Sequence, residues 1–152
     1  MTRVLIIEDD HDKEKAISNF VAENFLISHI SVARSMQTGL SAALLGDHDL
    51  ILLDMTMTNY ERSIQEDGGR PHHFAGREIL RQMLREDVLT PVVVVTQFGR
   101  FGEESEEVTL SDLQTELKGR FPQYLGTVHY RSNVDDWKKQ LSDLTTGILL
   151  RK

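Results

Sequence analysis

Oxygen-bearing side chains stand directly after three apolar runs of strand length in this sequence. Glu8 and Asp9 follow the run VLII, Asp54 follows LILL, and Thr96 follows VVVV. Acids that converge on one place repel one another unless a cation joins them. Oxygen ligands with positions left for water and phosphate suit Mg2+, and a carboxylate can attack phosphorus to form an acyl phosphate. The pattern indicates a magnesium site at which a carboxylate could accept a phosphoryl group.

The elements that must bring these residues together are five apolar runs, each followed by a segment of helical period. The runs are residues 4–7, 27–33, 50–53, 92–95 and 125–130. Asp12, Ser35 and Thr109 stand where N-caps of the following helices are expected. Apolar strands alternating with helices predict a parallel sheet buried on both faces. Right-handed crossovers make this a doubly wound α/β fold, whose ligands bind beyond the carboxyl ends of the strands.

The composition fits one domain and excludes several classes of protein. The chain has 152 residues, no cysteine and a formal net charge of −7. Without cysteine there are neither disulfides nor thiolate metal sites, and a reducing compartment is the simplest location. The acidic balance disfavours a nucleic-acid surface, and no apolar stretch approaches the roughly 20 residues that cross a bilayer. We expect a cytoplasmic protein that binds no nucleic acid and does not insert into a membrane.

Four motifs resemble the receiver domains of response regulators in two-component signalling. They are VLIIEDD (residues 4–10), LILLD (residues 50–54), GREIL (residues 76–80) and PVVVVT (residues 91–96). Together with the helices between them, they cover nearly the whole chain. The resemblance implies a flavodoxin-like (CheY-like) fold with five parallel strands in the order 2-1-3-4-5. We expect residues 1–152 to form a single receiver domain, with an insertion at about 57–74.

The resemblance also implies a role for each residue of the strand-end set. Asp54 would be the phosphoacceptor. Asp9 would bind Mg2+ directly, Glu8 would help through water, and the backbone carbonyl of Thr56 would complete the metal site. Thr96 would hydrogen-bond the phosphoryl oxygens and shift when Asp54 is modified.

The implied function is that of a phosphoprotein in a signalling relay. The phosphoryl donor would be a phosphohistidine on a histidine kinase or phosphotransfer protein, and the downstream partner is a protein that the sequence does not identify. Because the chain ends soon after the fifth helix, we expect no output domain. We also expect no enzyme activity beyond self-catalysed phosphotransfer and dephosphorylation. The helix with Leu110, Leu113 and Leu117 offers a face for a homodimer.

The sequence departs from the family at several positions around the predicted site. Receiver domains usually carry Lys-Pro at the end of the fifth strand, where this chain reads HYRSN. Arg131 in this stretch is a candidate substitute, although Arg and Lys are not interchangeable at such a site. Gln97 is larger than the family's usual residue and could crowd the phosphoryl pocket. The polar insertion is longer than connections of about 2–6 residues, which indicates a functional or disordered segment.

Two other interpretations stay open. In the first, the chain is a receiver-like interaction module that no longer uses phosphate. The missing lysine, Gln97 and the insertion favour it, and the intact acidic set disfavours it. In the second, the stretch DMTMT (residues 54–58) belongs to a phosphotransferase of the haloacid dehalogenase type. That match is short, no lysine is suitably placed, and the downstream acidic pair Asp135-Asp136 lies at the start of a predicted helix.

Overall fold

Five parallel strands form one sheet at the centre of the molecule. The computed structural model describes residues 2–58, 71–72, 74–97, 100–101 and 108–152. The sheet consists of β1 (Arg3–Ile7), β2 (His29–Ala33), β3 (Leu50–Leu53), β6 (Val92–Thr96) and β9 (Tyr124–His129). Its strand order is β2-β1-β3-β6-β9, and all four neighbouring pairs are parallel. The predicted order is therefore confirmed.

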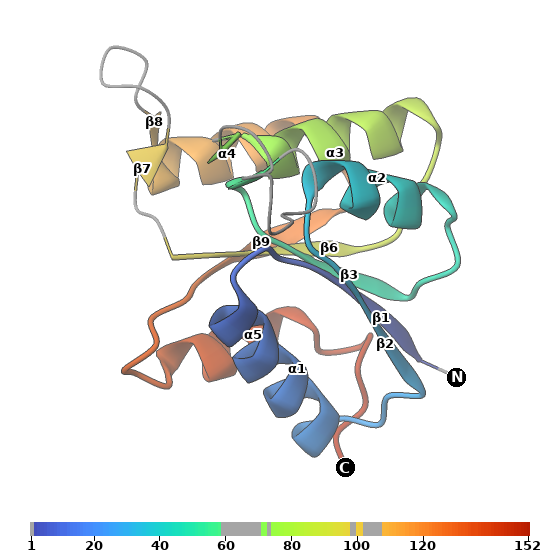
Figure 1. The fold of residues 1–152 in the computed structure, drawn as a ribbon, viewed down its shortest axis with the longest axis vertical. Coiled ribbons are helices and arrows are strands. Elements are labelled where there is room, and N and C mark those ends of the chain that lie inside the picture. Colours follow the sequence, from blue (N-terminus) through green and yellow to red (C-terminus); the bar gives the residue numbers. More distant parts are fainter. Residues whose placement is uncertain (1, 59–70, 73, 98–99, 102–107) are drawn as a thin grey trace, which may run out of the picture.

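Helices cover both faces of this sheet (Figure 1). The helices α2 (Met36–Leu44), α3 (Ala75–Arg85) and α4 (Leu110–Arg120) lie on one face, and α1 (His11–Asn24) and α5 (Asp136–Leu144) lie on the other. The side chains of the strands alternate between the two layers, so that Leu5 and Ile7 pack toward the three-helix side while Val4 and Ile6 pack toward α1 and α5. Residues 4–7 of β1, all of β3 and residues 92–95 of β6 are buried on both sides of the sheet, as expected for uninterrupted apolar runs.

Polar caps fix where the helices begin. The side chain of Ser35 accepts a hydrogen bond from Thr38 N, and that of Thr109 accepts one from Asp112 N, as predicted. The expected cap of the first helix was wrong, because Asp10 rather than Asp12 accepts from Lys13 N. Helix α1 therefore starts at His11, directly behind the acids that follow β1.

Two short antiparallel pairs lie outside the main sheet. β4 (Met57–Thr58) pairs with β5 (Pro71–His72), and β7 (Arg100–Phe101) pairs with β8 (Val108–Thr109). The first pair brings the two ends of the predicted insertion together, while most of the insertion lies outside the described residues. Residues 98–99 and 102–107, in the Gly- and Glu-rich stretch after β6, also lie outside the described residues.

The predicted dimer face on α4 needs a correction. Leu113 and Leu117 are buried against the sheet, in the core layer that α2 and α3 share, and Leu110 packs against the same layer. Leu113 and Leu117 therefore stabilise the domain itself and are not available to a second copy of the chain, whereas Leu110 is half-buried.

Candidate metal and phosphoacceptor site

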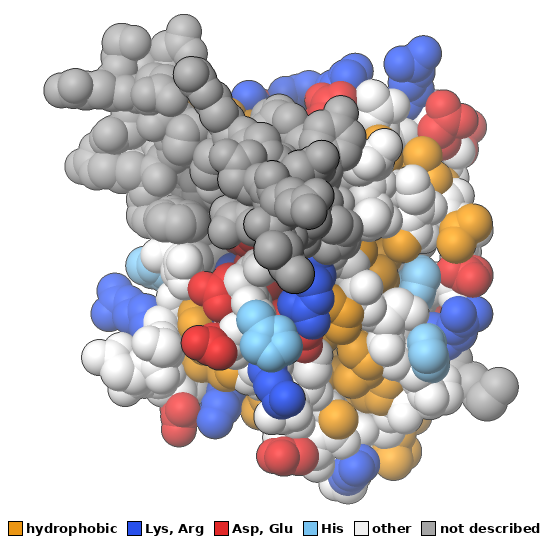
Figure 2. Space-filling model, viewed as in Figure 1, with side chains coloured by type: hydrophobic (Ala, Val, Ile, Leu, Met, Phe, Trp, Pro, Cys, Tyr) orange, Lys and Arg blue, Asp and Glu red, His pale blue; other side chains and the backbone are white. Residues whose placement is uncertain are grey.

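The carboxylates predicted to share a cation lie together at the carboxyl edge of the sheet. Glu8, Asp9 and Asp54 each offer an oxygen, and these oxygens all lie within 4.8 Å of one another. Parallel pairing of β1 with β3 places the two strand ends side by side, since Ile7 is in register with Leu53. The three acids differ in exposure: Glu8 and Asp54 are buried, and Asp9 is half-buried. In Figure 2, acidic side chains gather over the start of α1 beside a histidine and basic side chains.

The oxygen set fits Mg2+, the ion that the family resemblance implies. Carboxylates within reach of one centre and a half-exposed side suit an ion that keeps several waters and binds through a few carboxylates. Thr56 lies two residues past Asp54 in the same turn, and its carbonyl stays a predicted fourth ligand.

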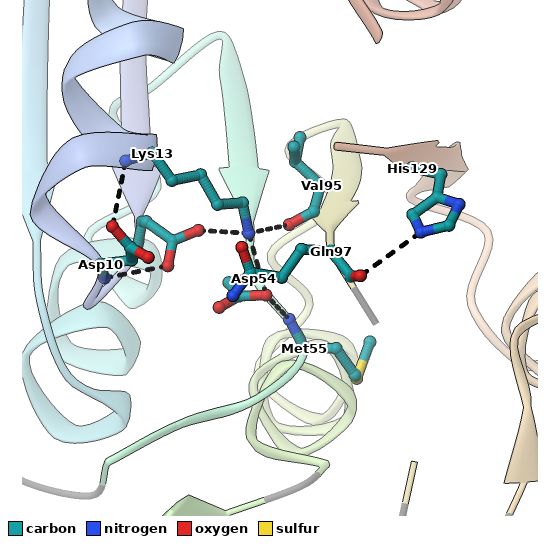
Figure 3. Close-up of polar contacts among 8 residues, drawn as sticks. Asp10, Lys13, Asp54, Met55, Val95, Gln97 and His129 are labelled. Atoms are coloured by element: carbon teal, nitrogen blue, oxygen red, sulfur yellow. Dashed lines mark hydrogen bonds and ion pairs between the residues drawn. The ribbon is translucent and has the colours of Figure 1, made fainter. Parts of the chain in front are cut away.

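A residue that was not expected at this site, Lys13, lies at its centre. Its side chain is 2% exposed, and its ammonium lies 2.5 Å from Glu8 Oε1 and 3.2 Å from Asp54 Oδ1. It also donates a hydrogen bond of 2.8 Å to the carbonyl oxygen of Val95. Figure 3 shows the ammonium between these three acceptors, which come from the ends of β1, β3 and β6.

Hydrogen bonds to the backbone hold the two buried carboxylates in place. Glu8 Oε2 accepts from Asp10 N at 3.1 Å, and Asp54 Oδ1 accepts from Met55 N at 2.8 Å. Asp54 therefore points one oxygen at both Lys13 and its own following amide (Figure 3). The nucleophile of the predicted reaction is thus held in a single orientation.

Burial controls the protonation of these groups. It raises the pKa of Glu8 to about 9, although the Lys13 ammonium acts in the opposite direction. Burial also raises the pKa of Asp54, although the Lys13 ammonium acts to lower it. Burial would lower the pKa of Lys13, but the Asp54 and Glu8 carboxylates outweigh it and raise that pKa. The metal-free site therefore combines a charged lysine with carboxyl groups that hold a proton more tightly than usual.

The other predicted site residues lie around this centre. Thr96 is fully buried as the last residue of β6, and its carbonyl accepts a hydrogen bond from Tyr130 N. Gln97 is exposed, and its side chain extends in the direction of Asp54 (Figure 3). Arg131 is exposed beyond the end of β9, and within the described ranges the ion pair to Asp54 comes from Lys13 instead. A phosphoryl-binding role for Thr96 stays a prediction.

The sequence contains a signal for Lys13 that spacing of acids alone could not reveal. Lys13, Ile17 and Val21 follow one another at four-residue intervals and are all buried on the inner side of α1. A lysine in the first turn of such a stripe can reach the adjacent strand ends, whereas an apolar residue would only fill the core.

The fold and the site together define a doubly wound α/β domain with an acidic cluster at its strand ends. No protein-family model matches the chain. The chain is 31% identical over 142 residues to the Detocs response regulatory protein DtcB of Enterobacter cloacae, covering 91% of this chain and 95% of that protein. It is also 31% identical over 144 residues to the uncharacterized protein y4jR of Sinorhizobium fredii, covering 93% and 95%.

Solved structures share the fold of this chain. The response regulator protein TrrA from Thermotoga maritima, in complex with Mg(2+)-BeF, matches with a TM-score of 0.60 at 17% identity, over 95% of this chain and 99% of that one. The chemotaxis protein CheY4 of Vibrio cholerae matches with a TM-score of 0.59 at 15% identity, over 98% and 99%. The chain belongs to the response-regulator receiver family. None of the helices in the described ranges combines the length and apolar composition that a bilayer crossing requires.

Proposed function

We propose that this receiver domain accepts a phosphoryl group on Asp54 in a Mg2+-dependent reaction and so relays a signal. The donor is a phosphohistidine of a histidine kinase or phosphotransfer protein, and the modified domain acts on a downstream protein in the cytoplasm. The observation that carries the proposal is the meeting of Glu8, Asp9 and Asp54 oxygens within 4.8 Å of one another. Three carboxylates face one buried ammonium, so the ionised cluster keeps an excess of negative charge that a divalent cation would neutralise, which supports metal-assisted chemistry.

Each residue of the site has a separate role in the proposed reaction. Asp9, with Glu8 behind it, holds the ion beside Asp54, and the bound Mg2+ would neutralise charge on the transferring oxygens. Asp54 attacks phosphorus from a carboxylate that the Met55 amide and Lys13 keep oriented. Thr96 at the end of β6 would donate its hydroxyl to a phosphoryl oxygen. Positioning and charge neutralisation are the main demands of phosphoryl transfer.

Intact-mass spectrometry tests the proposal. The protein is incubated with Mg2+ and a small acyl-phosphate donor, in parallel with Asp54→Asn and with a chelator control. We expect the wild type to gain the mass of one phosphoryl group, and neither control to gain it. An unmodified wild type that still binds Mg2+ would contradict phosphotransfer and favour the alternative below.

A phosphorylation-independent interaction module is the second candidate. One observation favours it, because the buried Lys13 ammonium pairs with both Glu8 and Asp54 and so neutralises part of the charge of the cluster itself. In that case the cluster would be structural, and partners would recognise a single conformation of the domain.

An enzyme of the haloacid dehalogenase type is the weakest candidate. Asp54 is the phosphoacceptor in both proposals, but the family assignment supports a signalling role without steady turnover. Incubation with phosphate esters should release no more than one equivalent of phosphate per protein. Sustained release would revive the enzymatic interpretation.

A further inference from the structure

Lys13 is the one group of the site to which the receiver pattern gives no role, and its environment is unusual for a lysine. The side chain is 2% exposed, and the ammonium's three donors are matched by Glu8 Oε1, Asp54 Oδ1 and the Val95 carbonyl. Burying a charged pair is weak evidence for stability, because an apolar residue of similar size often serves a core equally well. The contacts therefore call for a functional explanation.

The backbone of α1 fixes where this ammonium lies. Asp10 caps the helix by accepting from Lys13 N at 3.1 Å, so that Lys13 stands in the first turn. Ile17 and Val21 anchor the following turns against the sheet. The side chain can then run along the buried side of the helix to the strand ends. Its ammonium lies 5.9 Å from the centre of the Tyr130 ring, directly after β9.

The position of the Lys13 ammonium beside Asp54 bears on the missing lysine, the departure from the family that lies nearest to the site. Receiver domains usually carry a lysine at the end of the fifth strand, and here that strand leads into Tyr130 and the exposed Arg131. A cation reaches Asp54 nevertheless, but from the first helix. We infer that Lys13 is a catalytic residue that binds the phosphoryl group on Asp54, taking the place of the lysine absent from the end of β9. The inference rests on the proposed phosphotransfer function.

The reaction step defines what the ammonium does. A new bond forms between an Asp54 carboxylate oxygen and phosphorus while the bond from phosphorus to the donor breaks. With a phosphohistidine, the P–N bond breaks and its electron pair stays on the imidazole nitrogen; with the acyl phosphate of the test, the P–O bond breaks and the pair leaves with the donor's carboxylate. The group gained by Asp54 carries about −1.5 to −2 charges. Lys13 already lies 3.2 Å from Asp54 Oδ1, so its donors can turn to the phosphoryl oxygens with little movement.

Charge gives a test that separates this role from a structural one. When ionised, Glu8, Asp9 and Asp54 carry three negative charges, of which Lys13 neutralises one. Replacement by methionine, which has similar length, would leave the full charge facing Mg2+. Lys13→Met should therefore bind Mg2+ more tightly than the wild type and yet accept phosphoryl groups more slowly. A merely structural lysine would affect both properties in the same direction, since a collapsed site binds metal poorly.

The experiment compares the wild type, Lys13→Met, Lys13→Arg and the exposed-lysine control Lys139→Met. Calorimetry gives the Mg2+ affinity, and intact mass gives the rate of modification by a small acyl phosphate at saturating Mg2+. We expect Lys139→Met to match the wild type. Lys13→Met should react on the order of 10²-fold more slowly while binding Mg2+ several-fold more tightly, and Lys13→Arg should recover part of the rate.

Each outcome bears on one proposal. A wild type that is never modified defeats the proposed function. A wild type that is modified, together with Lys13→Met reacting at the same rate, overturns the inference about Lys13 alone. Loss of both rate and Mg2+ affinity in Lys13→Met overturns it as well. If Lys13→Met does not fold, NMR spectra of wild-type protein with 15N-labelled lysine test whether Lys13 binds the phosphoryl group. The buried ammonium signal should shift when Mg2+ and fluoroberyllate are added, and an unchanged signal contradicts the inference.

Discussion

Gly76 of α3 lies directly against the backbone of the phosphoacceptor Asp54. A Cβ atom on Gly76 would stand 2.7 Å from the Asp54 carbonyl oxygen and 3.0 Å from Met55 Cα. Gly76 N also donates a hydrogen bond of 3.0 Å to Met55 O. The start of α3 is thus pressed onto the turn that carries the nucleophile, and neither backbone atom can move aside as a flexible side chain could.

Gly76→Ala should therefore destabilise the domain and displace Asp54. Overpacking against fixed backbone costs about 1–3 kcal/mol, and urea unfolding measures it. The matched control is Gly119→Ala in α4, where a Cβ meets nothing within 4 Å. That control should gain roughly 0.5–1 kcal/mol, because alanine favours a helix over glycine. Equal stability changes in the two variants would contradict the close contact between α3 and Asp54.

Mg2+ should bind more tightly as the pH rises. The ordinary pKa of Glu8 is 4.5 and the folded value is about 9, so between these values the folded metal-free protein holds more protons than the unfolded chain. Its free energy of unfolding therefore falls as pH rises through this window. Mg2+ favours the ionised carboxylate and offsets that loss.

Thermal unfolding with and without Mg2+ measures this linkage. The rise in Tm caused by Mg2+ should be larger at about pH 8 than at about pH 6. Glu8→Gln removes one of the carboxyl groups whose pKa burial raises, and should reduce the difference. A Tm increment that is the same at both pH values in the wild type would contradict a metal site that includes Glu8.

Thr96 should matter through its hydroxyl. Thr96→Val keeps the shape of a side chain that is fully buried at the end of β6 but removes the oxygen. If that hydroxyl binds the phosphoryl group, modification of Asp54 should slow on the order of 10²-fold. Thr96→Ser retains the hydroxyl and should react at nearly the wild-type rate. Equal rates for the valine and serine variants would assign Thr96 a packing role.

The architecture could be predicted because uninterrupted apolar strands in a βα alternation allow few arrangements. The runs 4–7, 50–53 and 92–95 are so apolar that only a sheet covered on both faces accommodates them. Once these strands are parallel and adjacent, Glu8 and Asp54 must meet at one edge.

Lys13 and the cap of α1 escaped prediction for a physical reason. A lysine in a helix is usually solvated, so the spacing of Lys13 with Ile17 and Val21 is a weak signal until the path of α1 across the sheet is known. Asp10 and Asp12 are equally good caps by residue type, and the choice depends on where β1 ends. Arg131 was only a candidate substitute, because the resemblance implies a lysine at the end of the fifth strand, whereas the cation beside Asp54 comes from α1.

A crystal structure with Mn2+ in place of Mg2+ would test the central claim most directly, because anomalous scattering locates the ion. The account predicts a single ion bonded to carboxylate oxygens of Asp9 and Asp54, with the Lys13 ammonium retained beside Asp54. An ordered site without an ion at saturating Mn2+, with Glu8 and Asp54 still paired only to Lys13, would contradict it.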